Sequence, residues 1–168
     1  MKPSLILAVV FILASRVFAV GPQTMGSSHA ESGYDYKDMA ITVLVVPVEQ
    51  GMMWMNANYS YPLLASEGAK LVNLVQTAAR KIDVAVFNKT AVSYLQEIGQ
   101  LYTENGALVT VFFETDGYKS SYAVVRVMGF GCRDILLLNK KDAEDFINLL
   151  RNANSFVDNC QRQVALFR

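Results

Sequence analysis

The chain has 168 residues, and its 15 lysine and arginine residues balance its 15 aspartate and glutamate residues. A chain of this length fits a single domain and is long enough to bury a sizeable apolar core. The balanced charge argues against a nucleic-acid-binding protein, because such proteins carry a basic surface. It argues equally against tight electrostatic binding to anionic membranes.

The N-terminus has the three-part pattern of a secretory signal peptide. Lys2 precedes an apolar run over residues 5–13, and the small residues Val17 and Ala19 stand where signal peptidase requires them. The run is too short for a transmembrane helix, which needs about 20 apolar residues. We therefore predict that residues 1–19 are cleaved off after Ala19. The mature protein is then secreted or periplasmic, has no stable insertion in a membrane, and carries a net charge of about −2 because the removed segment is basic.

Residues 20–37 are rich in glycine and serine and hold few apolar side chains. This composition predicts a flexible leader between the cleavage site and the domain. The single histidine of the chain, His29, belongs to this leader. Residues 38–168 are predicted to form one domain.

The domain begins with two predicted strands. Residues 41–48 are rich in β-branched side chains, which favours a buried strand, and residues 52–60 alternate between two faces. We expect Pro62 to end the second strand and Ser66 to be the N-cap of a helix. Apolar residues at helical spacing carry this helix to about residue 82, and residues 83–87 fit either a helix or a strand.

Two dipeptides, Asn105-Gly106 and Asp116-Gly117, predict tight hairpin turns in the next part of the chain. Both central residues of a type I′ turn need a positive φ, which these pairs favour. The turns predict a meander of three strands near residues 92–103, 107–115 and 118–128.

Tight turns also fix the register between strands. Two-residue turns set Tyr102 opposite Val109 and Phe113 opposite Ser120. The predicted core face of the meander then holds Ile98, Tyr102, Val109, Val111, Phe113, Tyr122 and Val124.

The chain closes with a predicted strand at residues 134–138 and a helix that runs to about residue 158. Asn139 suits the N-cap of this helix, and Asp142 follows three residues later, as in a capping box. The predicted fold class is α+β: a mostly antiparallel sheet of about five to six strands, including a meander over residues 92–138, with two amphipathic helices packed on it.

The two predicted helices share a short pattern. Leu-Val-Asn-Leu-Val at residues 71–75 matches Phe-Ile-Asn-Leu-Leu at residues 146–150, at an offset of 75. Either two amphipathic helices converge on one pattern, or the chain repeats a β-rich unit that a helix closes.

Both cysteines, Cys132 and Cys160, lie in the predicted mature protein. Two cysteines in an exported protein favour one disulfide. A strand that starts at Cys132 and a helix that returns over the sheet would bring Cys160 back beside it. The alternative is a reactive thiol at Cys132, next to Arg133.

The sequence offers little for catalysis or metal binding. With His29 in the leader, the domain has no histidine to activate a serine or cysteine nucleophile. Ser120 and Ser121 lie next to Lys119, but serines beside a hairpin turn are ordinary turn residues. No residues have the spacing of zinc ligands. We therefore predict no catalytic residue, no metal and no cofactor.

The most unusual local composition is Met-Met-Trp-Met at residues 52–55, with two tyrosines close behind. Methionine and aromatic side chains form adaptable binding surfaces, although the same residue types also pack cores. Trp54, Tyr59 and Tyr61 are therefore the candidate residues for binding a ligand or partner. Asn58 and Asn88 stand in N-glycosylation acceptor patterns.

These features lead us to expect an exported, non-catalytic binding or interaction module whose partner is a protein or a small apolar ligand. The alternative is a small secreted hydrolase that uses carboxylates, with Glu97, Glu114 and Asp116 as candidates. A binding module should expose an apolar patch or an apolar pocket, whereas a hydrolase should cluster carboxylates in a cleft.

Overall fold

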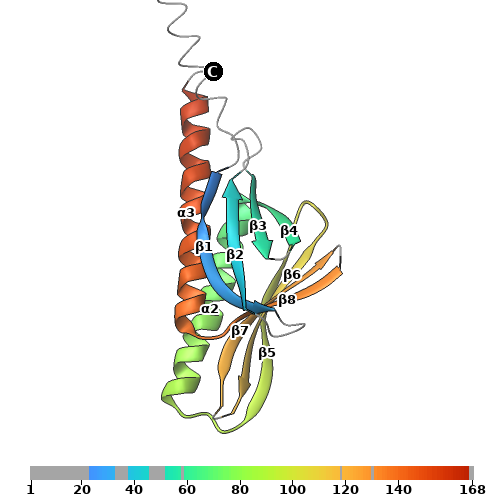
Figure 1. Cartoon of the computed structure of the whole chain (residues 1–168), viewed down its shortest axis with the longest axis vertical. Coiled ribbons are helices and arrows are strands. Elements are labelled where there is room, and N and C mark those ends of the chain that lie inside the picture. The colour runs from blue at the N-terminus through green and yellow to red at the C-terminus, as the bar shows by residue number, and fades with distance from the viewer. Residues whose placement is uncertain are drawn as a thin grey trace, which may run out of the picture.

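The computed structural model describes residues 23–32, 38–45, 52–57, 59–117, 119–129 and 131–166. These residues form an antiparallel sheet of eight strands with two long helices packed on it (Figure 1). The predicted α+β class and the predicted meander are therefore confirmed. The sheet has eight strands rather than five or six, because the predicted leader supplies one strand and the segment after residue 52 supplies two. The predicted signal peptide lies outside the described residues.

The strands are β1 (Gln23–Ser32), β2 (Asp38–Val45), β3 (Met52–Ala57), β4 (Tyr59–Leu64), β5 (Ser93–Tyr102), β6 (Leu108–Asp116), β7 (Ser121–Gly129) and β8 (Gly131–Leu137). The helices are α2 (Ala65–Phe87) and α3 (Lys140–Ala165).

The elements form two consecutive units of the same order, four strands followed by a helix. The first unit holds β1–β4 and α2, and the second holds β5–β8 and α3. The strand order in the sheet is β4-β3-β2-β1-β8-β7-β6-β5, so the units meet where β1 pairs with β8. The helices are exchanged between the units: α2 packs mainly over β5, β6 and β7, whereas α3 packs mainly over β1 and β2.

The two helices bury equivalent positions. They begin 75 residues apart, at Ala65 and Lys140, which is the offset of the pattern repeated in the sequence. The matched and fully buried pairs are Leu71 and Phe146, Val75 and Leu150, and Ala78 and Ala153. These side chains belong to one core that continues over β6, β7 and β8. The shared topology supports the interpretation that the chain repeats one unit.

The strand β1 corrects the predicted leader. The prediction for residues 20–37 is wrong over Gln23–Ser32, which form a strand in the middle of the sheet. Ala30 is fully buried, and a Cβ on Gly26 would lie 3.4 Å from Cδ1 of Leu149 in α3. Small side chains thus let α3 approach β1 closely. Met25 is the only large apolar residue of β1, and one such residue gives no alternating pattern for sequence reasoning to detect.

The start of α2 also differs from the prediction. Its N-cap is Leu64 rather than Ser66, and the helix continues to Phe87, which settles the open segment 83–87 as helical. Pro62 does not end a strand but lies within β4, opposite Trp54. Because β4 is at the edge of the sheet, the N–H that proline lacks is not needed on its outer side.

Both predicted hairpins form, but their turns are longer than two residues. The N–H of Thr103 donates to the carbonyl of Ala107 at 2.8 Å, and the N–H of Asp116 donates to the carbonyl of Ser120 at 2.9 Å. Type I′ geometry is therefore wrong. The glycines of both turns have positive φ. In the described part of the chain, Lys89 is the one non-glycine residue with positive φ.

The longer turns change the register. Tyr102 lies opposite Leu108, and Phe113 lies opposite Ala123. Tyr102 is therefore 72% exposed, and Leu101 takes the core position in its place. The predicted core positions of Val109, Val111 and Phe113 are confirmed. Val124 is buried but pairs with Phe112, so it lies on the opposite face of the sheet, as does Tyr122, which pairs with Glu114.

The predicted disulfide between Cys132 and Cys160 is wrong, because both cysteines are free. The prediction required α3 to return along β8, a strand of its own unit. Instead α3 packs over β1 and β2. Cys132 lies at the tip of the β7–β8 hairpin, opposite Met128, and this tip points away from α3 (Figure 1).

Candidate functional site

The structure places the three predicted contact residues in one hairpin at the edge of the sheet. Trp54 lies in β3 and pairs with Pro62, while Tyr59 and Tyr61 lie in β4. Their side chains are outside the described part of the structure, so their role in binding stays a prediction. Asn58 is also outside the described residues.

A different region exposes large apolar side chains. They lie between residues 84 and 95, at the end of α2 and the start of β5, and each is at least 43% exposed. The members are Val84, Val86, Phe87, Val92, Tyr94 and Leu95, and we call them the α2–β5 surface. Phe87 is the most exposed, at 87%.

The last turns of α2 explain part of this surface. Ala85 continues the buried stripe of the helix, whereas Val84, Val86 and Phe87 lie off that stripe and face outward. A helix that packs on a sheet normally places polar residues at such positions. Three exposed apolar residues there indicate a surface that a partner can cover.

The end of α2 fixes how the chain enters β5. The N–H of Thr90 donates to the carbonyl of Ala85 at 3.1 Å, and the N–H of Lys89 donates to that of Val86 at 3.3 Å. This pair of hydrogen bonds is a Schellman motif, whose residue after the helix adopts a left-handed conformation. Lys89 has this conformation, with a φ of 46°.

The strand β5 is the last strand of the sheet. One side pairs with β6, and within the described residues no strand pairs with the other side. An unpaired edge offers backbone N–H and C=O groups to another strand. The ring of Tyr94 packs edge-on against Phe113 with centroids 5.6 Å apart, which anchors the start of the edge. A bulge interrupts the ladder between Glu97 and Gly99.

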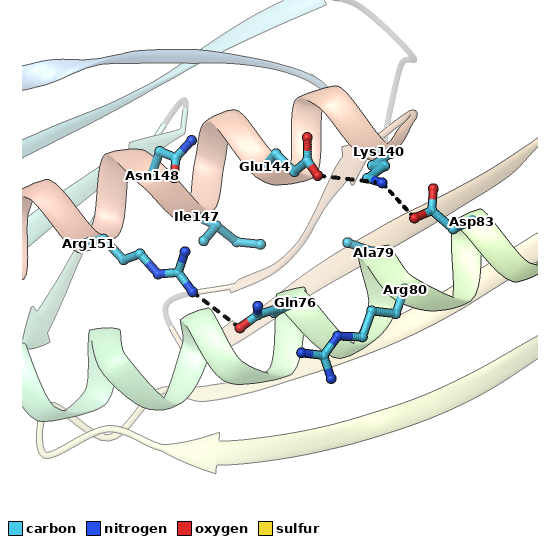
Figure 2. Close-up of a pocket in the computed structure, with 9 residues that line it drawn as sticks. All are labelled: Gln76, Ala79, Arg80, Asp83, Lys140, Glu144, Ile147, Asn148 and Arg151. Carbon is cyan, nitrogen blue, oxygen red and sulfur yellow. Dashed lines mark hydrogen bonds and ion pairs between the residues drawn. The ribbon is translucent and has the colours of Figure 1, made fainter.

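A polar groove of about 330 Å³ lies between the two helices (Figure 2). Nζ of Lys140 lies 2.7 Å from Oδ2 of Asp83 and 3.7 Å from Oε1 of Glu144. The hydrogen bond to Asp83 raises the pKa of Lys140 above its ordinary value. Arg151 also donates to Oε1 of Gln76 at 3.2 Å. These pairs link α2 to α3, so the lining of the groove already has a structural role.

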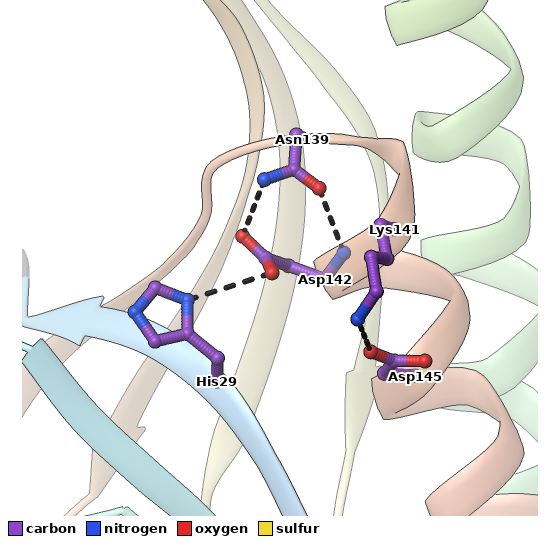
Figure 3. Close-up of polar contacts among 5 residues, drawn as sticks. All are labelled: His29, Asn139, Lys141, Asp142 and Asp145. Atoms are coloured by element: carbon purple, nitrogen blue, oxygen red, sulfur yellow. Dashed lines mark hydrogen bonds and ion pairs between the residues drawn. The ribbon is translucent and has the colours of Figure 1, made fainter.

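A second polar cluster lies at the start of α3 (Figure 3). Asn139 is the predicted N-cap, because its Oδ1 accepts the N–H of Asp142 at 2.9 Å. The return contact differs from a capping box: Oδ2 of Asp142 accepts a hydrogen bond at 2.9 Å from the side-chain amide Nδ2 of Asn139 rather than from its backbone N–H. Nδ1 of His29, in β1, lies 3.5 Å from Oδ1 of Asp142. The histidine therefore belongs to the fold, which corrects the prediction of a domain without histidine.

The pairing of His29 with Asp142 resembles half of an acid–base site, because a carboxylate can orient an imidazole. Asp142 is buried and His29 is about half exposed. The contact joins β1 of the first unit to α3 of the second. Sequence reasoning missed it because nothing in residues 20–37 predicted a strand.

The three carboxylates proposed for a hydrolase lie on the strands of the meander. Glu97 is exposed beside the bulge in β5, and Glu114 lies in β6 opposite Leu95. Asp116 ends β6, where its Oδ1 accepts a hydrogen bond from Oγ of Ser93 at 3.1 Å. Each carboxylate thus has a place in the meander.

Among the described residues, no three histidine, cysteine or acidic side chains gather closely enough to hold a metal ion. None of the helices in this part of the chain is both long enough and apolar enough to cross a membrane. Comparison with protein-family models, with curated proteins and with solved structures finds no match to this chain.

Proposed function

We propose that this chain is an exported, non-catalytic interaction module that binds a polypeptide partner at the α2–β5 surface. One observation carries the proposal: the large apolar side chains of this surface stand exposed directly beside an unpaired strand. Covering such side chains contributes about 25 cal/mol per Å² of apolar area removed from water, which offsets the entropy lost on association. Tyr94 and Leu95 project from opposite faces of β5, so a strand added at this edge would contact apolar side chains on both faces.

The neighbouring edge favours a polypeptide over a small apolar ligand. A free strand edge is satisfied by another strand, whose backbone pairs with it while its side chains contact the flanking surface. The groove between the helices is lined mainly by charged and polar side chains, which suits an apolar ligand poorly. The signal peptide pattern supports a role outside the cytoplasm.

Site-specific photo-crosslinking tests this proposal. A photoreactive amino acid at Leu95 should crosslink to a polypeptide when the mature chain is returned to the exported fraction of its source. The same group at Lys70, an exposed position on α2 outside the α2–β5 surface, is the matched control. Equal labelling at both positions, or labelling at neither, would contradict the proposal.

A further inference from the structure

We infer that the polypeptide on the α2–β5 surface is a second copy of this chain, with the two β5 strands antiparallel along their free edges. The inference rests on the proposed function, since it uses the same surface. In a twofold-symmetric dimer the same surface patch of each copy contacts that patch of the other copy, so the patch must be self-complementary. The charges and apolar side chains along β5 have this property.

The charges that flank β5 are opposite in sign. Lys89 precedes the strand and Glu104 follows it, and both are exposed. Within the described chain, neither side chain takes part in an ion pair or hydrogen bond. An antiparallel arrangement brings Lys89 of each copy toward Glu104 of the other. A parallel arrangement would bring like charges together, which is unfavourable.

The interior of β5 fits the same arrangement. Its only charged residue is Glu97. The bulge between Glu97 and Gly99 adds one residue to each strand. A register with Lys89 opposite Glu104 of the second copy therefore sets Gln96 opposite Gln96 and Glu97 opposite Leu95 of that copy, so the two Glu97 carboxylates do not directly face each other. The same register sets Val92, which is 67% exposed, opposite Leu101 of the second copy.

The opposite edge of the sheet is less suited to pairing. Pro62 lies within β4 and lacks the N–H that another strand would need. The described part of β5 contains no proline. A self-association through the sheet edges is therefore expected at β5 rather than at β4.

Sedimentation velocity of the mature chain over a wide range of concentrations measures this association. Lys89→Glu and Glu104→Lys should each raise the dimer dissociation constant about tenfold, because each replaces two attractive contacts by two repulsive ones. The double variant should return the dissociation constant to near its original value. Lys70→Glu, a charge reversal outside the surface, should leave it unchanged.

Leu95→Arg should abolish the dimer, whereas Leu166→Arg, at an exposed apolar residue that directly follows α3, should not. Circular dichroism checks that each variant is folded. A chain that stays monomeric at every concentration overturns the inference, and so does a double charge variant that fails to recover. If the monomeric chain still crosslinks to another polypeptide through Leu95, the inference fails and the proposed function stands. If it is monomeric and does not crosslink, both fail.

Discussion

The two units of this chain have the same order of elements, yet neither encloses its own core. Each helix crosses to the strands of the other unit, α2 to β5–β7 and α3 to β1 and β2. The apolar face of one unit is therefore covered by the helix of the other. This exchange makes the two units one cooperative structure, because removing either helix would uncover the strands of its partner.

A buried carboxylate stands at the same position of both helices. Glu67 in α2 and Asp142 in α3 are 75 residues apart, and both are at most 6% exposed. Glu67 accepts the N–H of Leu64 and, across the units, the N–H of Glu104, both at 2.7 Å. Asp142 is bound by Asn139 and contacts His29 across the units. One link between units thus uses backbone donors, and the other uses side chains.

The largest loss of stability is expected when equivalent core side chains of the two helices are removed. Phe146→Ala should lower the free energy of unfolding by about 3–5 kcal/mol and Leu71→Ala by about 2–5 kcal/mol. Urea unfolding followed by circular dichroism and by the fluorescence of Trp54, the single tryptophan, should give coincident transitions. Leu166→Ala, at an exposed position outside the α2–β5 surface, is the control and should change little. Two separated transitions would show that the units fold independently.

The next test cuts the link through Glu67. Glu67→Ala leaves the N–H groups of Leu64 and Glu104 without their acceptor, which should cost about 2–4 kcal/mol. Glu67→Gln keeps one acceptor oxygen and should cost about half as much. Hydrogen exchange at the Glu104 amide should speed up in the alanine variant more than in the glutamine variant. Unchanged exchange in both would mean that Glu67 does not join the units.

The sequence predicted the parts of the fold that large apolar side chains carry. The stripes of both helices, the meander and the cap at Asn139 follow from periodicity and capping chemistry. Residues 23–32 were missed because small side chains pack β1 against α3 and give no periodicity. The register was missed because turn length depends on the backbone of residues 103–107 and 116–120, which a dipeptide alone does not determine.

The candidate surface was missed for a different reason. By sequence, residues 83–87 fit either a helix or a strand, and the difference decides which side chains face outward. Once they are helical, Val84, Val86 and Phe87 fall off the buried stripe, which is the signal that a helical wheel of 67–87 would have given. Trp54, Tyr59 and Tyr61 were chosen by composition, which does not tell core packing from exposure.

A smaller effect is expected at the second link between the units. His29→Gln should lower stability by no more than about 1 kcal/mol, because the imidazole is half exposed and 3.5 Å from the carboxylate. Asp142→Asn, alone and combined with His29→Gln, completes a double-mutant cycle that isolates the contact. A coupling energy larger than the loss of stability in Glu67→Ala would mean that the contact between His29 and Asp142 is the stronger link between the units.

The state of the two cysteines tests the exchange of helices between the units, with little effect on stability. A disulfide between Cys132 and Cys160 would tie α3 to β8 of its own unit, which the exchange of helices opposes. We therefore expect two free thiols when the purified chain is denatured without reductant and titrated with a thiol reagent. In the native chain Cys132 is exposed, whereas burial raises the pKa of the Cys160 thiol.

The raised pKa means that folding favours the neutral thiol of Cys160 over the thiolate. The small contribution of this neutral thiol to stability is present below the ordinary thiol pKa and is lost as the pH rises through the raised pKa. Cys160 should accordingly be alkylated more slowly than Cys132, because only the thiolate reacts. Peptide mass spectrometry after brief labelling measures both rates. If the two thiols react only after reductant is added, Cys132 and Cys160 form a disulfide, which requires α3 to pack over its own unit. The exchange of helices, and with it the expected cooperative unfolding of the two units, would then be wrong.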